Sequence, residues 1–315
     1  MDELQLFNRR NFIKTSASVL AFAALTNSPL QLFAKQEPVK ITILHTNDWH
    51  SRIEPFGKDA GQNAGLGGAA SRAALIKKIR AEEKNILLLD AGDIFQGTPY
   101  FNFFEGELEY KLMSEMGYDL ATFGNHDFDN GIEGIINQLR FAKFEFVNCN
   151  YDFSNTLLSD KVKPYKLYNK GGIKIGVFGI GIELKGLVPD ELYGNIKYND
   201  PIIAANKIAE ELKLKHKCDL IICLSHLGYK YQDEKVSDIT LSKNSKYIDL
   251  IIGGHTHTFL KTPDKQKNSE GKDVLINQVG WAGINLGRID YTFEPLKNKP
   301  TQTIASVLNI GEVNS

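Results

Sequence analysis

Residues 85–93, NILLLDAGD, decide the fold class, because they combine an apolar run of strand length with acidic residues at its end. Residues 67–84 (GGAASRAALIKKIRAEEK), which precede it, show helical periodicity, and residues 40–46 (KITILHT) form an earlier strand-like run. Alternation of short β-prone runs with helical segments is typical of βαβ units. We therefore expect an α/β fold with a largely parallel sheet.

The same alternation continues along the chain, with helical segments at 106–117, 131–143 and 201–216 and strand-like runs at 119–125, 144–150, 219–225 and 247–254. Residues 164–180 differ, because they hold two β-prone runs joined by Asn169-Lys170-Gly171-Gly172, which is a hairpin signal. A second sheet is expected to start there. We expect residues 272–294 to form a closing β segment, and residues 35–315 to form one catalytic domain.

Composition is that of an ordinary globular protein, with 42% hydrophobic residues, 37 Lys plus Arg and 38 Asp plus Glu among 315 residues. The formal net charge of −1 argues against a nucleic acid polymer or a membrane surface as partner. The three cysteines, Cys149, Cys218 and Cys223, include no C-x-x-C pair, and buried thiols are expected rather than disulfides.

Residues 1–34 are expected to be an export signal. Arg9 and Arg10, followed by Phe12, Ile13 and Lys14, resemble a twin-arginine signal, the type that exports folded proteins. The alternative is a membrane anchor, but Thr26 to Pro29 interrupt an apolar run that is shorter than the roughly 20 residues a span requires. We favour cleavage after Ala34 and a periplasmic or otherwise exported protein, with no membrane span after cleavage.

Potential metal ligands follow five strand-like runs. They are Asp48 and His50 in HTNDWH, Asp93 in LLLDAGD, Asn125 and His126 in GNHDFD, His226 in ICLSH, and His255 and His257 in IIGGHTH. Each motif alone is weak evidence, since a single Asp after a strand is more often a helix cap. Because the carboxyl ends of parallel strands face one crevice, however, we expect all these side chains to converge.

The ligand types indicate the metal chemistry. Imidazole and carboxylate groups without thiolate suit Zn, Mn, Fe, Co or Ni. The candidates exceed the needs of one tetrahedral site and favour two divalent metal ions, for which a shared carboxylate is the usual bridge. Asp93 stands alone in its loop and is the expected bridging residue.

The ordered motifs D-x-H, G-D, G-N-H-D, S-H and G-H-x-H resemble those of the calcineurin-like metallophosphoesterases. More narrowly, ILHTNDWH, LLLDAGDIFQGTPYF, GNHDFDNG and IIGGHTHT resemble the catalytic domain of the periplasmic 5′-nucleotidase family, and the likeness runs from about Lys40 to about Arg288. The resemblance implies a double β-sandwich flanked by helices, in a four-layer αββα arrangement.

The resemblance also implies roles for the site residues. One metal ion would be bound by Asp48, His50, Asp93 and His257, and the other by Asp93, Asn125, His226 and His255. His126 would remain free for catalysis, as a transition-state stabiliser or a general acid, and Asp129 would orient it in preference to the adjacent Asp127. The alternative for both aspartates is N-capping of the helix expected after them.

The function implied is that of a dinuclear-metal hydrolase of phosphate esters, most directly a 5′-nucleotidase-type phosphomonoesterase acting on nucleotides. One alternative is a phosphodiesterase acting on 2′,3′-cyclic nucleotides, or another ester hydrolase of the same fold. A second alternative is a non-catalytic metal-binding module. The chain is expected to lack the C-terminal specificity domain of 5′-nucleotidases, and a separate chain that supplies such a domain is a possible partner.

Overall fold

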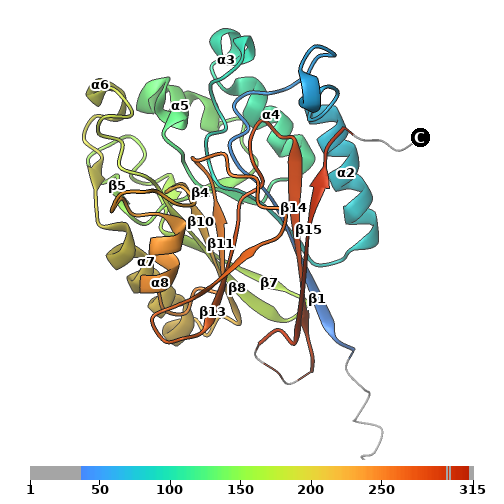
Figure 1. Ribbon diagram of the computed structural model, residues 1–315. Helices are drawn as coiled ribbons and strands as arrows, with labels where there is room; N and C mark the ends of the chain where they lie inside the picture. The colour runs from blue at the N-terminus through green and yellow to red at the C-terminus, as the bar shows by residue number, and fades with distance from the viewer. Residues whose placement is uncertain (1–36, 296, 298, 312–315) are drawn as a thin grey trace, which may run out of the picture. The chain divides into compact units, whose positions relative to one another are not determined.

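The computed structural model describes residues 37–311, apart from 296 and 298. The expected export signal, residues 1–34, lies outside the described residues. Residues 39–311 belong to one compact unit (Figure 1). Among the described helices, none has both the length and the apolar character needed to cross a membrane.

One sheet of the unit has seven strands, in the order β15-β14-β1-β2-β3-β4-β6. Their bounds are β1 Val39–Thr46, β2 Ile86–Asp90, β3 Leu120–Ala121, β4 Glu145–Val147, β6 Val162–Lys163, β14 Asn285–Phe293 and β15 Gln302–Asn309. The strands β1, β2, β3, β4 and β6 are parallel, whereas β14 and β15 add antiparallel pairs at one edge.

The other large sheet has six strands, in the order β12-β13-β11-β10-β8-β7. Their bounds are β7 Tyr165–Lys170, β8 Ile173–Ile180, β10 Leu220–Ser225, β11 Leu250–Gly253, β12 Asp264–Lys267 and β13 Asp273–Asn277. The four central strands are parallel and the two outer strands pair antiparallel. A two-stranded sheet pairs β5 (Tyr151–Asp152) with β9 (Lys197–Tyr198).

Helices pack on the outer faces of both large sheets. The helices are α2 Ala69–Glu82, α3 Pro99–Phe104, α4 Glu107–Met116, α5 Gly131–Leu139, α6 Asp190–Tyr193, α7 Pro201–Glu210 and α8 Asp238–Asn244, and the short turns are η2 Gly61–Asn63, η3 His126–Phe128 and η4 Glu211–Lys215. Buried residues of α2, α4 and α5 share one apolar cluster with the seven-stranded sheet. Those of α7 and α8 share another with the six-stranded sheet.

A third apolar cluster lies between the two sheets, so three apolar interfaces separate four layers. Strand β10 shows how one sequence serves two interfaces. Its Ile222 and Leu224 face the other sheet, while Ile221 and Cys223 belong to the cluster shared with α7 and α8. Successive side chains of a strand point to opposite faces, so a continuously apolar strand is buried on both sides. The expected αββα fold is confirmed.

The hairpin expected at 169–172 is also confirmed, because β7 and β8 pair antiparallel across it and open the second sheet. The prediction of a single closing β segment at 272–294 is wrong. It is divided into β13 of one sheet and β14 of the other, joined by residues 278–284. Gly280, Ala282 and Gly283 have positive φ in this connection, and such backbone cannot continue a strand. Strands β12 and β15 were not predicted from the sequence.

The two large sheets approach each other closely at Gly179 of β8. A Cβ atom at this position would lie 2.0 Å from the carbonyl oxygen of Val147 in β4. The Gly179 carbonyl also accepts a hydrogen bond of 2.9 Å from the backbone N–H of Cys149, just beyond β4. Any side chain at position 179 must therefore displace backbone atoms of β4, which move less easily than a flexible side chain.

We predict that Gly179→Ala lowers the free energy of unfolding by about 1–3 kcal/mol, the usual cost of overpacking a rigid interior. Urea denaturation measures this change. Gly57→Ala is the matched control, because a Cβ there meets only the flexible, exposed side chain of Asp59. Equal stability of the two variants would contradict the assigned contact between the sheets.

Candidate metal centre

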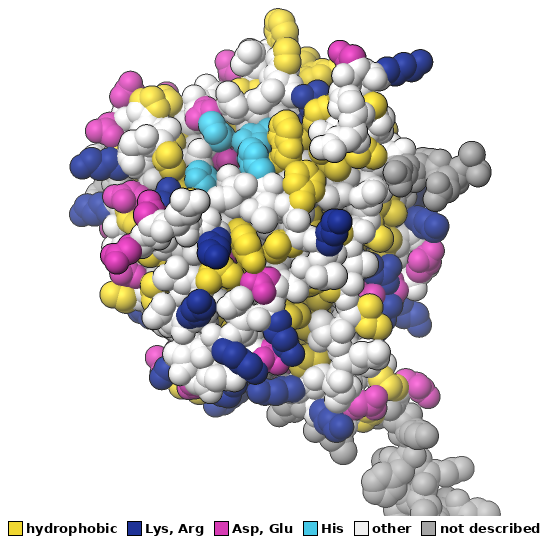
Figure 2. Space-filling model, in the orientation of Figure 1, with side chains coloured by type: hydrophobic (Ala, Val, Ile, Leu, Met, Phe, Trp, Pro, Cys, Tyr) yellow, Lys and Arg dark blue, Asp and Glu magenta, His cyan; other side chains and the backbone are white. Residues whose placement is uncertain are grey.

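The nine side chains predicted from the motifs are brought to one end of both sheets. They follow β1 (Asp48, His50), β2 (Asp93), β3 (Asn125, His126, Asp129), β10 (His226) and β11 (His255, His257). These strands are parallel within each sheet, so their carboxyl ends lie at the same end of it. Figure 2 shows histidine side chains gathered at one place on the surface. The predicted convergence is confirmed.

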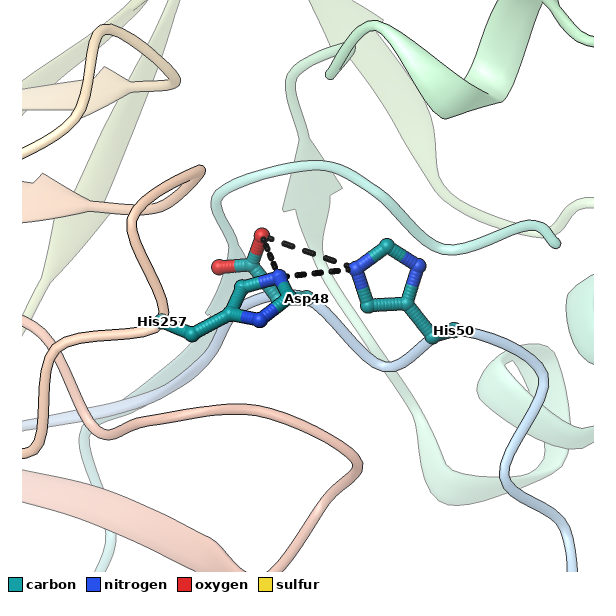
Figure 3. Close-up of side chains that lie close together, drawn as sticks. All are labelled: Asp48, His50 and His257. Carbon is teal, nitrogen blue, oxygen red and sulfur yellow. Dashed lines mark hydrogen bonds and ion pairs between the residues drawn. The ribbon is translucent and has the colours of Figure 1, made fainter. Parts of the chain in front are cut away.

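Asp48, His50 and His257 form the first of two ligand-like groups (Figure 3). The Nε2 atom of His257 lies 3.3 Å from Asp48 Oδ1 and 3.0 Å from His50 Nε2. The Nε2 atom of His50 lies 3.9 Å from the same Asp48 oxygen. Figure 3 shows the two imidazoles reaching this point from separate loops.

Asp93, His226 and His255 form the second group. The Nδ1 atom of His226 donates a 2.6 Å hydrogen bond to the carbonyl of Ala91, which turns Nε2 toward Asp93 Oδ2 at 3.1 Å. That Nε2 atom is buried and, beside the carboxylates of Asp93 and Asp48, has no hydrogen-bond partner among the described residues. A metal-binding histidine usually donates the N–H of one ring nitrogen to a backbone carbonyl or carboxylate, which leaves the other nitrogen for the metal.

Asp93 lies between the two groups. Its Oδ2 atom is 3.1 Å from His226 Nε2 in the second group and 3.8 Å from His50 Nε2 in the first. Burial alone would raise the pKa of Asp93, but His226 and His50 together hold that pKa well below its usual range. The carboxylate is therefore ionised and shared, which is the position expected of a bridging ligand.

Asn125 joins the second group through its side-chain oxygen, which is 2.8 Å from Nδ1 of His255. Burial, followed by the charge of His226, lowers the pKa of His255 to about 4, so this imidazole is neutral at ordinary pH. A neutral imidazole and an amide oxygen are both able to bind a metal ion.

His126 and Asp129 form a pair at the rim of the site. The Nδ1 atom of His126 lies 2.8 Å from Asp129 Oδ2, and this hydrogen bond raises the pKa of His126 even though partial burial opposes it. The backbone N–H of His126 donates a 2.8 Å hydrogen bond to Asp93 Oδ1. The pair therefore has the geometry predicted for an oriented imidazole, and the alternative of helix capping by Asp129 is wrong. Asn130, not Asp129, precedes α5.

Asp127 connects two loops of the site, a role that was not predicted from the sequence. Its buried carboxylate accepts four backbone hydrogen bonds, from the N–H groups of Gly124 at 2.8 Å, Asp93 at 3.0 Å, Ile94 at 2.9 Å and Phe95 at 3.2 Å. It joins the loop after β2 to the loop after β3. The alternative that Asp127 caps the following helix is wrong. Its carboxylate oxygens instead accept hydrogen bonds from backbone N–H groups of these two loops.

The backbone of the site is strained at five of the candidate ligands. Asp48, His50, Asp93, His255 and His257 all have positive φ, between 51° and 71°. Residues other than glycine in this left-handed region cost roughly 1–3 kcal/mol each, and such residues cluster at functional sites. Backbone hydrogen bonds hold the strained turns, including Asp48 N–H to Gly92 O at 2.9 Å and His50 N–H to Asp93 O at 3.0 Å.

Residues 41–259 match the family model described as calcineurin-like phosphoesterase, which is more than half of the chain. The chain belongs to the calcineurin-like phosphoesterase family. The resemblance inferred from the motifs is thereby confirmed.

Similar proteins in this phosphoesterase family include 5′-nucleotidases. The snake venom 5′-nucleotidase of Gloydius brevicauda is 33% identical over 279 residues, covering 82% of this chain and 46% of that protein. The 5′-nucleotidase of Vibrio vulnificus is 33% identical over 313 residues, covering 90% and 55%. The crystal structure of a 5′-nucleotidase precursor from Thermus thermophilus has a TM-score of 0.77 at 33% identity, covering 86% of this chain and 55% of that one. The chain spans about half the length of the curated relatives it matches.

Two further residues support the phosphoesterase site and were missed from the sequence. Asn47 donates a 2.6 Å hydrogen bond to the Gly280 carbonyl and accepts one of 3.0 Å from the N–H of Val279, which ties the Asp48 loop to the connection between β13 and β14. The ring of Trp281, in that connection, stacks on His257 with centroids 5.6 Å apart. The only sequence signal was a Gly-Trp pair inside an expected strand.

We predict that Asp127→Asn lowers the free energy of unfolding by about 1–3 kcal/mol, because the new amide NH₂ faces two backbone N–H donors that lose their acceptor. Thermal or urea denaturation measures the effect. Asp233→Asn, at an exposed position with one backbone hydrogen bond, is the control and should change little. A stability of Asp127→Asn equal to that of the control would refute the bracing role.

Proposed function

We propose that this site binds two divalent metal ions bridged by Asp93 and hydrolyses phosphate monoesters of nucleotides. The observation that carries the proposal is the position of Asp93 between the two ligand-like groups. One ion would be bound by Asp48, His50, Asp93 and His257, and the other by Asp93, Asn125, His226 and His255. The buried Nε2 of His226 fits a metal ligand, because the Ala91 carbonyl fixes the other ring nitrogen and Nε2 faces the Asp93 carboxylate.

The donor atoms restrict the metal. Imidazole nitrogens, carboxylate oxygens and one amide oxygen, with no thiolate in either group, suit Zn, Mn, Fe, Co or Ni. When bound, such ions supply Lewis acidity and an activated water for attack on phosphorus. The residues themselves hold the ligand atoms in place, since the loops are braced by Asp127 and the His226 ring is fixed by Ala91.

His126 is the proposed proton-transfer residue. Its side chain is 37% exposed, so it reaches the open side of the site, and Asp129 orients it through Nδ1. This leaves Nε2 available to a substrate. The raised pKa of His126 favours the protonated imidazole, which is able to donate a hydrogen bond or a proton to the oxygen of the leaving group.

Nucleotides are the proposed substrates for two reasons. The similar proteins described above are named 5′-nucleotidases. In addition, aromatic rings adjoin the first ligand-like group, because Trp281 stacks on His257 and Phe56 lies 5.9 Å from Trp281 in an edge-on arrangement. Half-exposed aromatic rings are a suitable surface for a flat base. We retain the prediction that a separate chain adds contacts to the base.

Hydrolysis of a substrate panel tests this proposal. With Mn added, the purified chain should release phosphate from nucleoside 5′-monophosphates, chelation by EDTA should abolish the release, and Asp93→Ala should serve as the inactive reference. Preferred cleavage of 2′,3′-cyclic nucleotides would replace the proposal with the diesterase alternative. Metal binding without hydrolysis of any ester in the panel would favour a non-catalytic module.

Because Asn125 is a proposed metal ligand and His126 the proposed proton-transfer residue, we expect substitution of each to cause a different defect. His126→Ala should retain both ions and lower kcat by roughly 10²- to 10⁴-fold, the range for loss of a proton-transfer group. Asn125→Ala should lose one ion, because an oxygen ligand is removed. Elemental analysis and steady-state kinetics measure the two effects.

His216→Ala is the control for these variants. His216 contacts Tyr165 and precedes β10, whereas the proposed ligand His226 follows the other end of that strand, so this variant should leave metal content and kcat unchanged. A comparison of p-nitrophenyl phosphate with a nucleoside monophosphate separates the two roles of His126, since a good leaving group needs little protonation. Loss of metal from His126→Ala would contradict the assignment.

We also propose export by the twin-arginine route, based on Arg9 and Arg10 and the apolar run after them. Replacement of both residues by Lys should leave the precursor inside the cell, because this route reads the arginine pair. Immunoblotting of cell fractions detects the difference. Normal export of the double variant would indicate the general secretory route.

A further inference from the structure

A cavity of about 820 Å³ lies at the end of the sheets opposite to the metal centre. Tyr247, Ile248 and Asp249, which immediately precede β11, line part of it, whereas His255 and His257 follow the same strand at its other end. Its volume is within the range of roughly 300–1,000 Å³ typical of small-molecule sites. It is separate from the candidate active site.

The cavity exists because the two large sheets do not close against each other at this edge. Leu275 of β13 and Ala305 of β15 line it from opposite sheets. Both are only partly buried, although both pack against the cluster between the sheets. The apolar interior of the sandwich is therefore accessible here.

Tyr291 of β14 supplies a buried polar group to this cavity. Its side chain is only 2% exposed, and its hydroxyl has no hydrogen-bond partner within the described part of the chain. Burial, followed by the charge of Asp249, raises the pKa of Tyr291, so the hydroxyl remains a donor. A buried hydroxyl without a partner is unfavourable, and a ligand oxygen would satisfy it.

The rim of the cavity is positively charged. Five lysines and two aspartates line it, namely Lys213, Lys265, Lys267, Lys272, Lys299, Asp249 and Asp273. Lys265 and Lys267 both pair with Asp273. Lys213 donates a 2.8 Å hydrogen bond to the Cys218 carbonyl, and both Lys213 and Lys299 act electrostatically on Asp249, but within the described ranges neither ammonium group forms an ion pair of 4.0 Å or less. The excess of positive charge is local, because the whole chain has a formal charge of −1.

In Figure 2, Lys and Arg side chains are numerous on the lower part of the face shown, below the histidines, and hydrophobic side chains are visible between them. This combination of cationic groups around an accessible apolar interior matches a ligand with an anionic group on an apolar body.

We propose that this cavity binds a small amphipathic organic anion, with a carboxylate, sulfonate or phosphate group held by Lys213 and Lys299 and an apolar or aromatic body between β13 and β15. The Tyr291 hydroxyl donates a hydrogen bond to the ligand. The site is independent of the metal centre and of its proposed activity.

Fluorescence titration of the full chain with 8-anilinonaphthalene-1-sulfonate tests the proposal, with the uncharged N-phenyl-1-naphthylamine as a matched probe. The sulfonate should bind saturably at one site per chain. Lys213→Glu and Lys299→Glu should each weaken its binding about tenfold, as expected for loss of a contact to a charged group, and should change binding of the uncharged probe less than twofold. Tyr291→Phe should also weaken sulfonate binding, and Ala305→Trp should block both probes by filling the cavity.

Lys207→Glu is the control, because Lys207 is an exposed residue of α7 outside the cavity and carries the same change of charge. Asp93→Ala, which removes the carboxylate proposed to bridge the metal ions, should bind the sulfonate with unchanged affinity, because the two sites are separate. Non-saturable binding, or equal effects of Lys213→Glu and Lys207→Glu, would overturn the proposal. A change of molecular mass of Ala305→Trp in light scattering would also overturn it, because the cavity would then be an interface between copies of the chain.

Discussion

The ionised carboxylate of Asp93, enclosed with that of Asp48 among imidazoles, is the constraint on which the rest of the site depends. Both carboxylates are essentially excluded from water, and buried charge of one sign is tolerated only with compensating charge. The surrounding loops accept positive φ at five residues in order to present their side chains to this point. Asp127 then fixes two of those loops by collecting their N–H groups. Strain and bracing are both expected where ligand atoms must be held before a metal ion binds.

The fold supplies this arrangement through its strand directions. Each large sheet has a parallel centre, so the loops after β1, β2 and β3 emerge at the same end as those after β10 and β11. Apolar side chains on both faces of these strands make three interfaces, which hold the two sheets in one relative position. The close backbone approach at Gly179 limits how far the sheets are able to shift. Ligands from two sheets therefore meet at one point, although the strands that carry them belong to different hydrogen-bonded sheets.

The sequence predicted the features that depend on local pattern. The α/β class, the hairpin at 169–172 and the convergence of ligand residues all follow from periodicity, turn residues and strand ends. The four-layer arrangement was predicted only from the resemblance to the metallophosphoesterases. The division of 272–294 between two sheets was missed, since positive φ at Ala282 is not visible from residue type. The bracing by Asp127 and the stacking of Trp281 were missed because they join segments distant in sequence. The assignment of ligands to each metal ion and the export signal stay predictions.

Anomalous X-ray diffraction from crystals grown with Mn, measured above and below the Mn absorption edge, tests the central claim most directly. We predict two anomalous peaks roughly 3.5–4 Å apart, both in contact with the Asp93 carboxylate. One peak should lie against the group of Asp48, His50 and His257, and the other against the group of His226, His255 and Asn125. A single peak at full metal loading, or peaks that do not contact Asp93, would contradict a shared two-metal centre.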